Sequence, residues 1–103
     1  MKKEVKITTA TDGVHKKKAV FSVDNKKVKT TKFGAKGYSD YISYSRSNPA
    51  EAEKHKTAYL TRHKATENWS DPKSSGALSR WILWNKPTLP ASIADYKKRF
   101  GFK

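Results

Sequence analysis

The excess of positive charge, together with large aromatic side chains, constrains this chain more than any single motif. The sequence carries a formal net charge of +14 and also contains three tryptophans and five tyrosines. A disordered basic tail lacks such apolar anchors. An ordinary folded domain does not tolerate the repulsion among so many like charges unless a negatively charged partner screens them. We therefore expect a small folded module that binds something negatively charged.

The length and composition narrow the class of protein further. A chain of 103 residues favours one domain, and it buries only about 60 to 70% of its unfolded surface, so the core is modest. The absence of cysteine excludes a disulfide framework and a thiolate metal site. No apolar run approaches the roughly 18 residues of a membrane span, and the first residues are charged. We expect neither a membrane span nor a secretory signal.

The first third of the chain has the pattern of a β-sheet. Residues 4–33 alternate between apolar or β-branched and polar side chains with a period of two. Asp12-Gly13 and Asp24-Asn25 interrupt the alternation, and both pairs suit tight turns because they tolerate positive φ. The pattern predicts a three-stranded antiparallel meander, with one apolar face and one lysine-covered face. The predicted strands are residues 4–10, 17–24 and 27–33.

The remainder is predicted to be a connecting arm followed by about three short helices, which gives an α+β fold. The arm is residues 34–48, and its segment 38–47 contains tyrosines without a clear period, so we expect a partner surface to order that segment. Asn48-Pro49 predicts a helix over residues 49–64, with Asn48 as its N-cap. Ser74 or Ser75 caps a second predicted helix, and Thr88 or Leu89 begins a third that Gly101 ends. The predicted ranges are residues 76–85 for the second helix and 88–100 for the third.

The chain is thus read as one domain over residues 1–103, made of a meander (1–33), the arm (34–48) and a helical part (49–103). Apolar residues at spacings of three and four on the last two helices predict the main helical core. Its members are Leu78, Trp81, Ile82, Ile93, Tyr96 and Phe100.

The sequence contains no pattern that specifies catalysis. His55 and His63 lie eight residues apart on one predicted helix, about 12 Å by helix rise, which is too far for both to ligate one metal ion. There is no cysteine nucleophile, glycine-rich phosphate loop or cluster of carboxylates. We therefore predict a non-enzymatic protein with no catalytic residues, no metal ligands and no cofactor.

Basic residues interleaved with aromatic ones instead indicate polyanion binding, because cations contact phosphates while aromatic rings stack on bases. Trp69 and Trp84 are the candidate stacking residues, although core burial is an equally good reading of both. The lysines of the meander also fit a merely solvated sheet face. The predicted polyanion-binding residues are Lys16, Lys17, Lys18, Lys26, Lys27, Arg62, Lys64, Lys73, Arg80, Lys86, Lys97, Lys98 and Arg99.

Part of the chain resembles a known protein family. The longest matching block is Gly76-Ala-Leu-Ser-Arg-Trp-Ile-Leu-Trp-Asn-Lys-Pro87, and the other matching segments are residues 33–41, 59–64, 67–69 and 92–100. The family consists of small, basic, uncharacterised proteins encoded by large double-stranded DNA viruses of algae and protists. The resemblance covers about residues 28–103. It implies a viral context and carries no catalytic residues.

Charge and resemblance together predict a virion component, namely a minor capsid, cement or genome-associated protein that binds acidic capsid surfaces or the packaged genome. The expected partners are other virion proteins, nucleic acid, or both, with DNA favoured over RNA. The expected location is the virion, and the host cytoplasm or nucleus during infection. The alternative is a nucleic-acid-binding protein without sequence preference that acts on viral or host DNA or RNA, and a factor that binds a host protein is a third reading.

Overall fold

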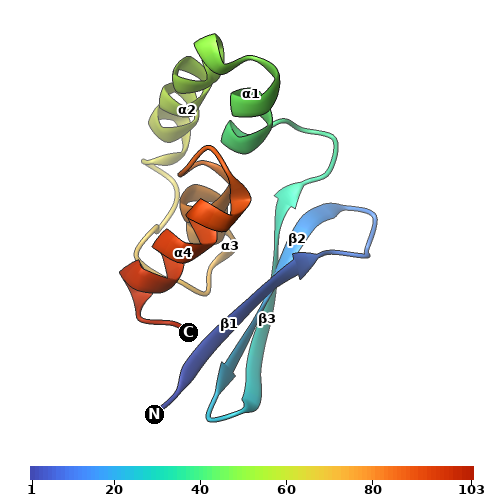
Figure 1. Ribbon diagram of the computed structural model, residues 1–103, viewed down its shortest axis with the longest axis vertical. Helices are drawn as coiled ribbons and strands as arrows, with labels where there is room; N and C mark the ends of the chain where they lie inside the picture. The colour runs from blue at the N-terminus through green and yellow to red at the C-terminus, as the bar shows by residue number, and fades with distance from the viewer.

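A three-stranded antiparallel sheet lies along one side of the molecule. The helices of residues 75–100 pack beside it, and the two helices of residues 41–63 lie together beyond one end of the sheet (Figure 1). The computed structural model describes residues 1–103. This arrangement confirms the predicted α+β class, with the meander first and the helices after it. The elements are β1 (Lys3–Thr9), β2 (His15–Val23), β3 (Lys26–Ala35), α1 (Tyr41–Ser47), α2 (Pro49–His63), α3 (Ser75–Leu78), the π-helical turn η1 (Ser79–Leu83) and α4 (Leu89–Phe100).

The sheet has the predicted order β1-β2-β3 and the two predicted turns. Asp24 and Asn25 connect β2 to β3 with φ of 50° and 68°, the backbone that a two-residue hairpin turn requires. The connection between β1 and β2 is longer, and the Asp12 carboxylate organises it. One oxygen of Asp12 accepts the backbone N–H groups of Val14 (3.0 Å) and His15 (2.9 Å).

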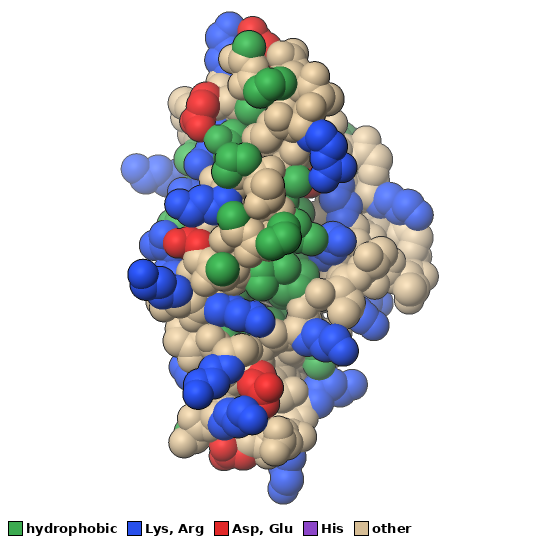
Figure 2. Space-filling model, in the orientation of Figure 1, with side chains coloured by type: hydrophobic (Ala, Val, Ile, Leu, Met, Phe, Trp, Pro, Cys, Tyr) green, Lys and Arg blue, Asp and Glu red, His purple; other side chains and the backbone are tan.

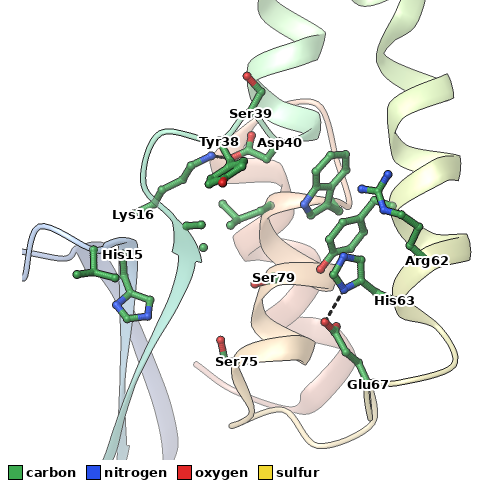
Figure 3. A pocket seen from close by; sticks show the side chains of 16 residues that line it. His15, Lys16, Tyr38, Ser39, Asp40, Arg62, His63, Glu67, Ser75 and Ser79 are labelled. Carbon is green, nitrogen blue, oxygen red and sulfur yellow. Dashed lines mark hydrogen bonds and ion pairs between the residues drawn. The ribbon is translucent and has the colours of Figure 1, made fainter.

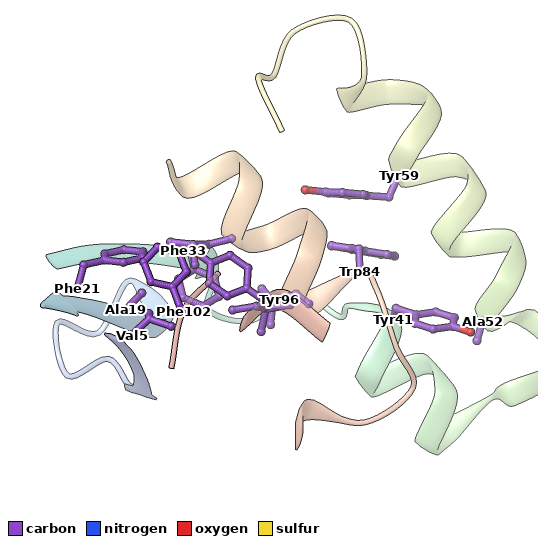
Figure 4. Packing of buried hydrophobic residues seen from close by; sticks show 13 residues of the cluster. Val5, Ala19, Phe21, Phe33, Tyr41, Ala52, Tyr59, Trp84, Tyr96 and Phe102 are labelled. Atoms are coloured by element: carbon purple, nitrogen blue, oxygen red, sulfur yellow. The ribbon is translucent and has the colours of Figure 1, made fainter. Parts of the chain in front are cut away.

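The apolar face of the sheet forms half of the core. Directly paired residues share a face, so Val5 lies beside Phe21 on the side that the helices cover. Of the six residues predicted for the helical core, Leu78, Ile82 and Tyr96 are fully buried, whereas the other three are half-buried against them. In Figure 4, Tyr96 lies beside Phe102, which in turn lies beside Phe21 of the sheet. The buried apolar residues include Val5, Ala19, Phe21, Phe33, Leu78, Ile82, Tyr96 and Phe102.

The predicted connecting arm contains a helix that the sequence analysis missed. The side chain of Asp40 caps α1 by accepting the backbone N–H of Ser43 (3.0 Å). Tyr41 is buried in the core, and its hydroxyl donates to Glu53 of α2 (2.6 Å). Residues 41–47 are thus ordered by α2 of the same chain, so the expectation that a partner surface orders this segment was wrong.

The helix boundaries follow the predicted caps with one exception. Ser74 and Thr88 accept N–H groups at the starts of α3 and α4, and Gly101 ends α4 in the left-handed region with φ of 74°. Asn48 precedes α2, but its side chain makes no capping bond. Its backbone N–H donates to Tyr44 instead, because the residue also ends α1.

The predicted second helix widens into a π-helical turn after one α-helical turn. The N–H of Trp84 donates to the carbonyl of Ser79, five residues earlier, at 3.0 Å. Such a turn changes the direction of the side chains that follow it. Trp84 consequently stacks on Tyr59 of α2, with ring centroids 4.3 Å apart and planes 5° apart.

The last residues of the chain cover the free edge of β1. The backbone of Lys103 donates to the carbonyl of Lys3 (2.8 Å) and accepts the N–H of Val5 (3.1 Å). The ring of Phe102 packs on Phe21 and Tyr96 at centroid distances of 5.4 and 5.8 Å. Both chain ends therefore lie close together beside the sheet (Figure 1).

Candidate polyanion-binding surface

Most of the positive charge has no acidic partner within the protein. Five of the 23 Lys and Arg side chains form an ion pair with a carboxylate, and the other 18 form none. The five paired residues are Lys2, Lys16, Lys32, Lys54 and Arg99. An uncompensated field of this size attracts polyanions.

The first part of the candidate surface is the end of the sheet at the turn between β2 and β3. Residues 24–30 are all exposed. Successive strand residues point to opposite faces, so an unbroken exposed run means that no helix covers either face here. Lys2 lies beside this turn, because its backbone N–H donates to the carboxylate of Asp24 (2.7 Å). We call this end the lysine tip, which comprises Lys2, Lys3, Lys26, Lys27 and Lys29.

The lysine tip continues into a shallow groove of about 440 Å³ beside β1. Three lysines line this groove, whereas Glu4 is its single acid. Asn25 belongs both to the groove and to the turn of the lysine tip, so the two features are continuous. Figure 2 shows Lys and Arg side chains over this lower half of the molecule and also over its upper half. The groove is lined by Lys6, Lys97, Lys103, Glu4, Val5, Val20, Ser22 and Asn25.

The two predicted lysine clusters of the meander lie at opposite ends of it. Lys26 of β3 pairs with Val23 of β2. Lys16 lies seven residues before Val23 on β2, which places it about 23 Å along the strand from the Lys26 end. Lys16 also forms an ion pair with the buried Asp40 (2.7 Å), and its side chain is only 20% exposed. Lys26 and Lys27 therefore belong to the candidate surface, and Lys16 is withdrawn from it.

The predicted pairing of cations with tryptophans exists, but it is internal. The guanidinium carbons of Arg80 and Arg99 lie 4.0 and 3.9 Å from the ring centroid of Trp81. Both guanidinium groups are thus within cation–π distance of the same indole ring. Arg80 also donates to the carbonyl of Trp84 (2.9 Å), and Arg99 pairs with Asp95 (3.3 Å). Burial is the main cause that lowers the pKa of Arg80, followed by the charge of Arg99.

Neither candidate stacking residue is open to a base. Trp84 is buried against Tyr59. Trp69 is half-buried, its ring lies 5.6 Å from Arg80, and its indole N–H donates to Glu67 (2.9 Å). Base stacking on either tryptophan therefore requires disruption of the core or of this network, and we withdraw both.

The other predicted cations are spread over the molecule. Lys97 lines the groove, and Lys98 follows it on α4. Arg62, Lys64 and Lys86 are exposed near the ends of α2 and η1, away from the turn between β2 and β3. The half-buried residues among them are Lys17, Lys18 and Lys73. The sequence analysis missed Lys2, Lys3, Lys6, Lys29 and Lys103, although the exposed strand end and the chain ends bring them to the candidate surface.

Two further observations concern other kinds of site. No group of three or more His, Asp or Glu side chains is placed to hold a metal ion. No helix has both the length and the apolar composition needed to cross a membrane.

Comparisons of the chain with family models, curated proteins and solved structures found no match.

Proposed function

We propose that this protein is a non-enzymatic virion component that binds the phosphate backbone of the packaged genome. The observation that carries the proposal is the set of 18 Lys and Arg side chains without an acidic partner, several of which form the lysine tip and its groove. The virion context rests on the resemblance of residues 28–103 to the family of viral basic proteins.

The placement of the cations favours an extended polyanion over a compact acidic ligand. They occur on strands at one end, along the groove, and on helix surfaces, within a molecule of 42 × 27 × 26 Å. Duplex DNA presents one negative charge per roughly 1.7 Å of its axis and so offers phosphates across such a span. Flexible lysines bind phosphates as point charges, without reading the base edges. The proposed binding is accordingly independent of sequence.

The test is the salt dependence of duplex binding by the wild type and by two triple variants with equal charge loss. The tip variant is Lys26→Gln, Lys27→Gln, Lys29→Gln, and the control is Lys54→Gln, Lys64→Gln, Lys86→Gln on the helical side. Each lost phosphate contact lowers the slope of log affinity against log salt by about 0.9, so the tip variant loses up to about 2.7. The control loses less. Equal losses in both variants would contradict a defined surface, and a shallow wild-type slope would contradict genome binding.

Purified particles test the virion context separately. We expect many copies of the protein in virions, released by salt together with the genome. Its presence in particles emptied of DNA would favour the acidic capsid surface as partner. Its absence from particles, with nucleic-acid binding retained, would favour the alternative of a binding protein that acts in the infected cell.

A further inference from the structure

A second concavity lies at the opposite end of the sheet from the lysine tip. It has a volume of about 510 Å³, within the usual range of small-ligand sites. Its walls come from the start of β2, the end of β3, the end of α2 and the turn η1, as Figure 3 shows. We call it the cleft. Nothing in the proposed backbone binding makes use of it.

The rim of the cleft carries two large apolar side chains that the core does not use. Tyr38 is 74% exposed and Val14 is 63% exposed, and only two other large apolar residues of the chain are comparably open. A backbone hydrogen bond from Lys36 to the carbonyl of Val14 (2.9 Å) holds the two rim segments together. The rim thus presents an exposed aromatic side chain and an aliphatic neighbour, which a flat ring of a ligand can cover with a gain from apolar burial.

The inner walls combine balanced charge with hydrogen-bonding groups. Asp40 is paired with Lys16 (2.7 Å), and Glu67 is paired with the Nδ1 atom of His63 (2.7 Å). Each acid in the cleft therefore already has a side-chain nitrogen within hydrogen-bond distance. Arg62 lies on the rim, is exposed and has no carboxylate partner.

We propose that the cleft binds an unpaired base of a single-stranded nucleic acid, which stacks on Tyr38 while Arg62 contacts the adjoining phosphate. This inference rests on the proposed function, because the lysine tip and other surface cations bring the strand to the protein. It adds a preference for single-stranded segments to a surface that otherwise binds any phosphate backbone.

The chemistry of the cleft fits a base better than a phosphate or an aliphatic group. Lys16, the one lysine of the walls, is already engaged by Asp40, which leaves only Arg62 on the rim for a phosphate. The exposed phenol ring and the paired polar groups suit a flat, uncharged ring with donors and acceptors on its edge. Hydroxyl groups of Ser39 and Ser75 also line the opening and add further hydrogen-bonding positions.

The main experiment compares Tyr38→Ala and Tyr38→Phe for binding to labelled oligothymidylate, oligouridylate and a mixed-sequence duplex at matched salt. Stacking on one aromatic side chain changes affinity by roughly 5- to 150-fold, so Tyr38→Ala loses this factor for single strands and nothing for the duplex. Tyr38→Phe keeps the ring and retains wild-type affinity. The two oligonucleotides distinguish a DNA strand from an RNA strand as the source of the base. Because Tyr38 is exposed, neither variant disturbs the core.

A second pair of variants tests the phosphate contact, and a spectrum tests the location. Arg62→Gln weakens single-strand binding more than Lys64→Gln, a matched control two residues away that does not line the cleft. Addition of oligothymidylate shifts the backbone amide resonances of Ser39 and Ser75 and the indole resonance of Trp84, all of which line the cleft.

The outcomes separate this inference from the proposed function. Unchanged single-strand affinity in Tyr38→Ala, with salt-dependent duplex binding intact, overturns the inference and leaves the proposed function standing. Loss of co-sedimentation with purified capsid protein in Tyr38→Ala, without any effect on nucleic acid, assigns the cleft to a protein segment and also overturns it. Failure of the wild type to bind any nucleic acid removes both.

Discussion

Two glycines near the end of β3 share a backbone conformation but have different surroundings. Gly34 and Gly37 have φ of 77° and 92°, which side-chain-bearing residues rarely adopt. A Cβ atom on Gly34 would lie 2.6 Å from Cδ1 of Leu83, a buried residue, whereas one on Gly37 would meet nothing within 4 Å. Only Gly34 allows η1 to approach the strand this closely.

The first prediction concerns this pair. Gly37→Ala costs about 1 to 2 kcal/mol through its backbone alone. Gly34→Ala costs that amount and also about 1 to 3 kcal/mol for overpacking at Leu83. Chemical denaturation of both variants measures the difference. Equal destabilisation would mean that Leu83 moves aside without cost.

The second prediction concerns the tryptophans. Trp84→Ala removes a buried ring that stacks on Tyr59, and we expect it to cost about 3 to 5 kcal/mol. Trp69→Ala, at a half-buried position, serves as the comparison and is expected to cost less. Thermal unfolding measures both. A larger loss of stability in Trp69→Ala than in Trp84→Ala would mean that the contacts of Trp69 with Arg80 and Glu67 stabilise the fold more than the stacking of Trp84 on Tyr59.

At the scale of elements, the loop between β1 and β2 depends on one carboxylate. The N–H of His15 is the largest cause that lowers the pKa of Asp12, followed by the His15 ring and the N–H of Val14. Lys32 adds an ion pair at 3.6 Å. A carboxyl whose folded pKa is lowered stabilises the fold above its unfolded pKa of about 3.9, and this contribution is lost as the pH falls through the folded pKa.

The third prediction follows from that sign. Below about pH 4 the wild type loses stability, because Asp12 binds a proton in the unfolded chain at a higher pH than in the folded protein. Asp12→Asn loses less stability over the same range, because its side chain does not titrate. Urea unfolding at a series of acidic pH values measures this difference. Glu51→Gln is the control, because Glu51 is only paired with Lys54 at 3.6 Å. An acid dependence identical in the wild type and Asp12→Asn would contradict the role of this carboxylate.

At the scale of the whole molecule, the sheet and the helices share one core. Phe102 joins them, because its ring contacts Phe21 of β2 and Tyr96 of α4 while the next residue pairs with β1. Separate unfolding of the two parts would expose both sides of this contact. We therefore expect the sheet and the helices to unfold together.

The fourth prediction tests this unity. Phe102→Ala costs about 3 to 5 kcal/mol and lowers the unfolding midpoint equally by tryptophan fluorescence, which reports on the helical part, and by amide resonances of β1 to β3. Phe100→Ala, at a half-buried position nearby, costs less. Different midpoints from the two probes would show that the sheet and the helices are separate folding units.

Local signals in the sequence determined the fold class and most element boundaries. Asp24-Asn25, Ser74, Thr88 and Gly101 act on backbone groups within a few residues, so their roles follow from residue type and position. The period of two in the meander likewise needs only the alternation of side chains along a strand. The net charge of +14, which motivates polyanion binding, is a property of composition.

Only the tertiary structure decided which aromatic and charged side chains remain accessible to a binding partner. Lys16 and Asp40 are 24 residues apart, and Arg80 and Arg99 meet on Trp81 only because α4 folds back against η1. Such contacts depend on which elements pack together, and no local pattern specifies that. The exposed strand end and the cleft arise for the same reason, because burial is decided by where the helices stop covering the sheet.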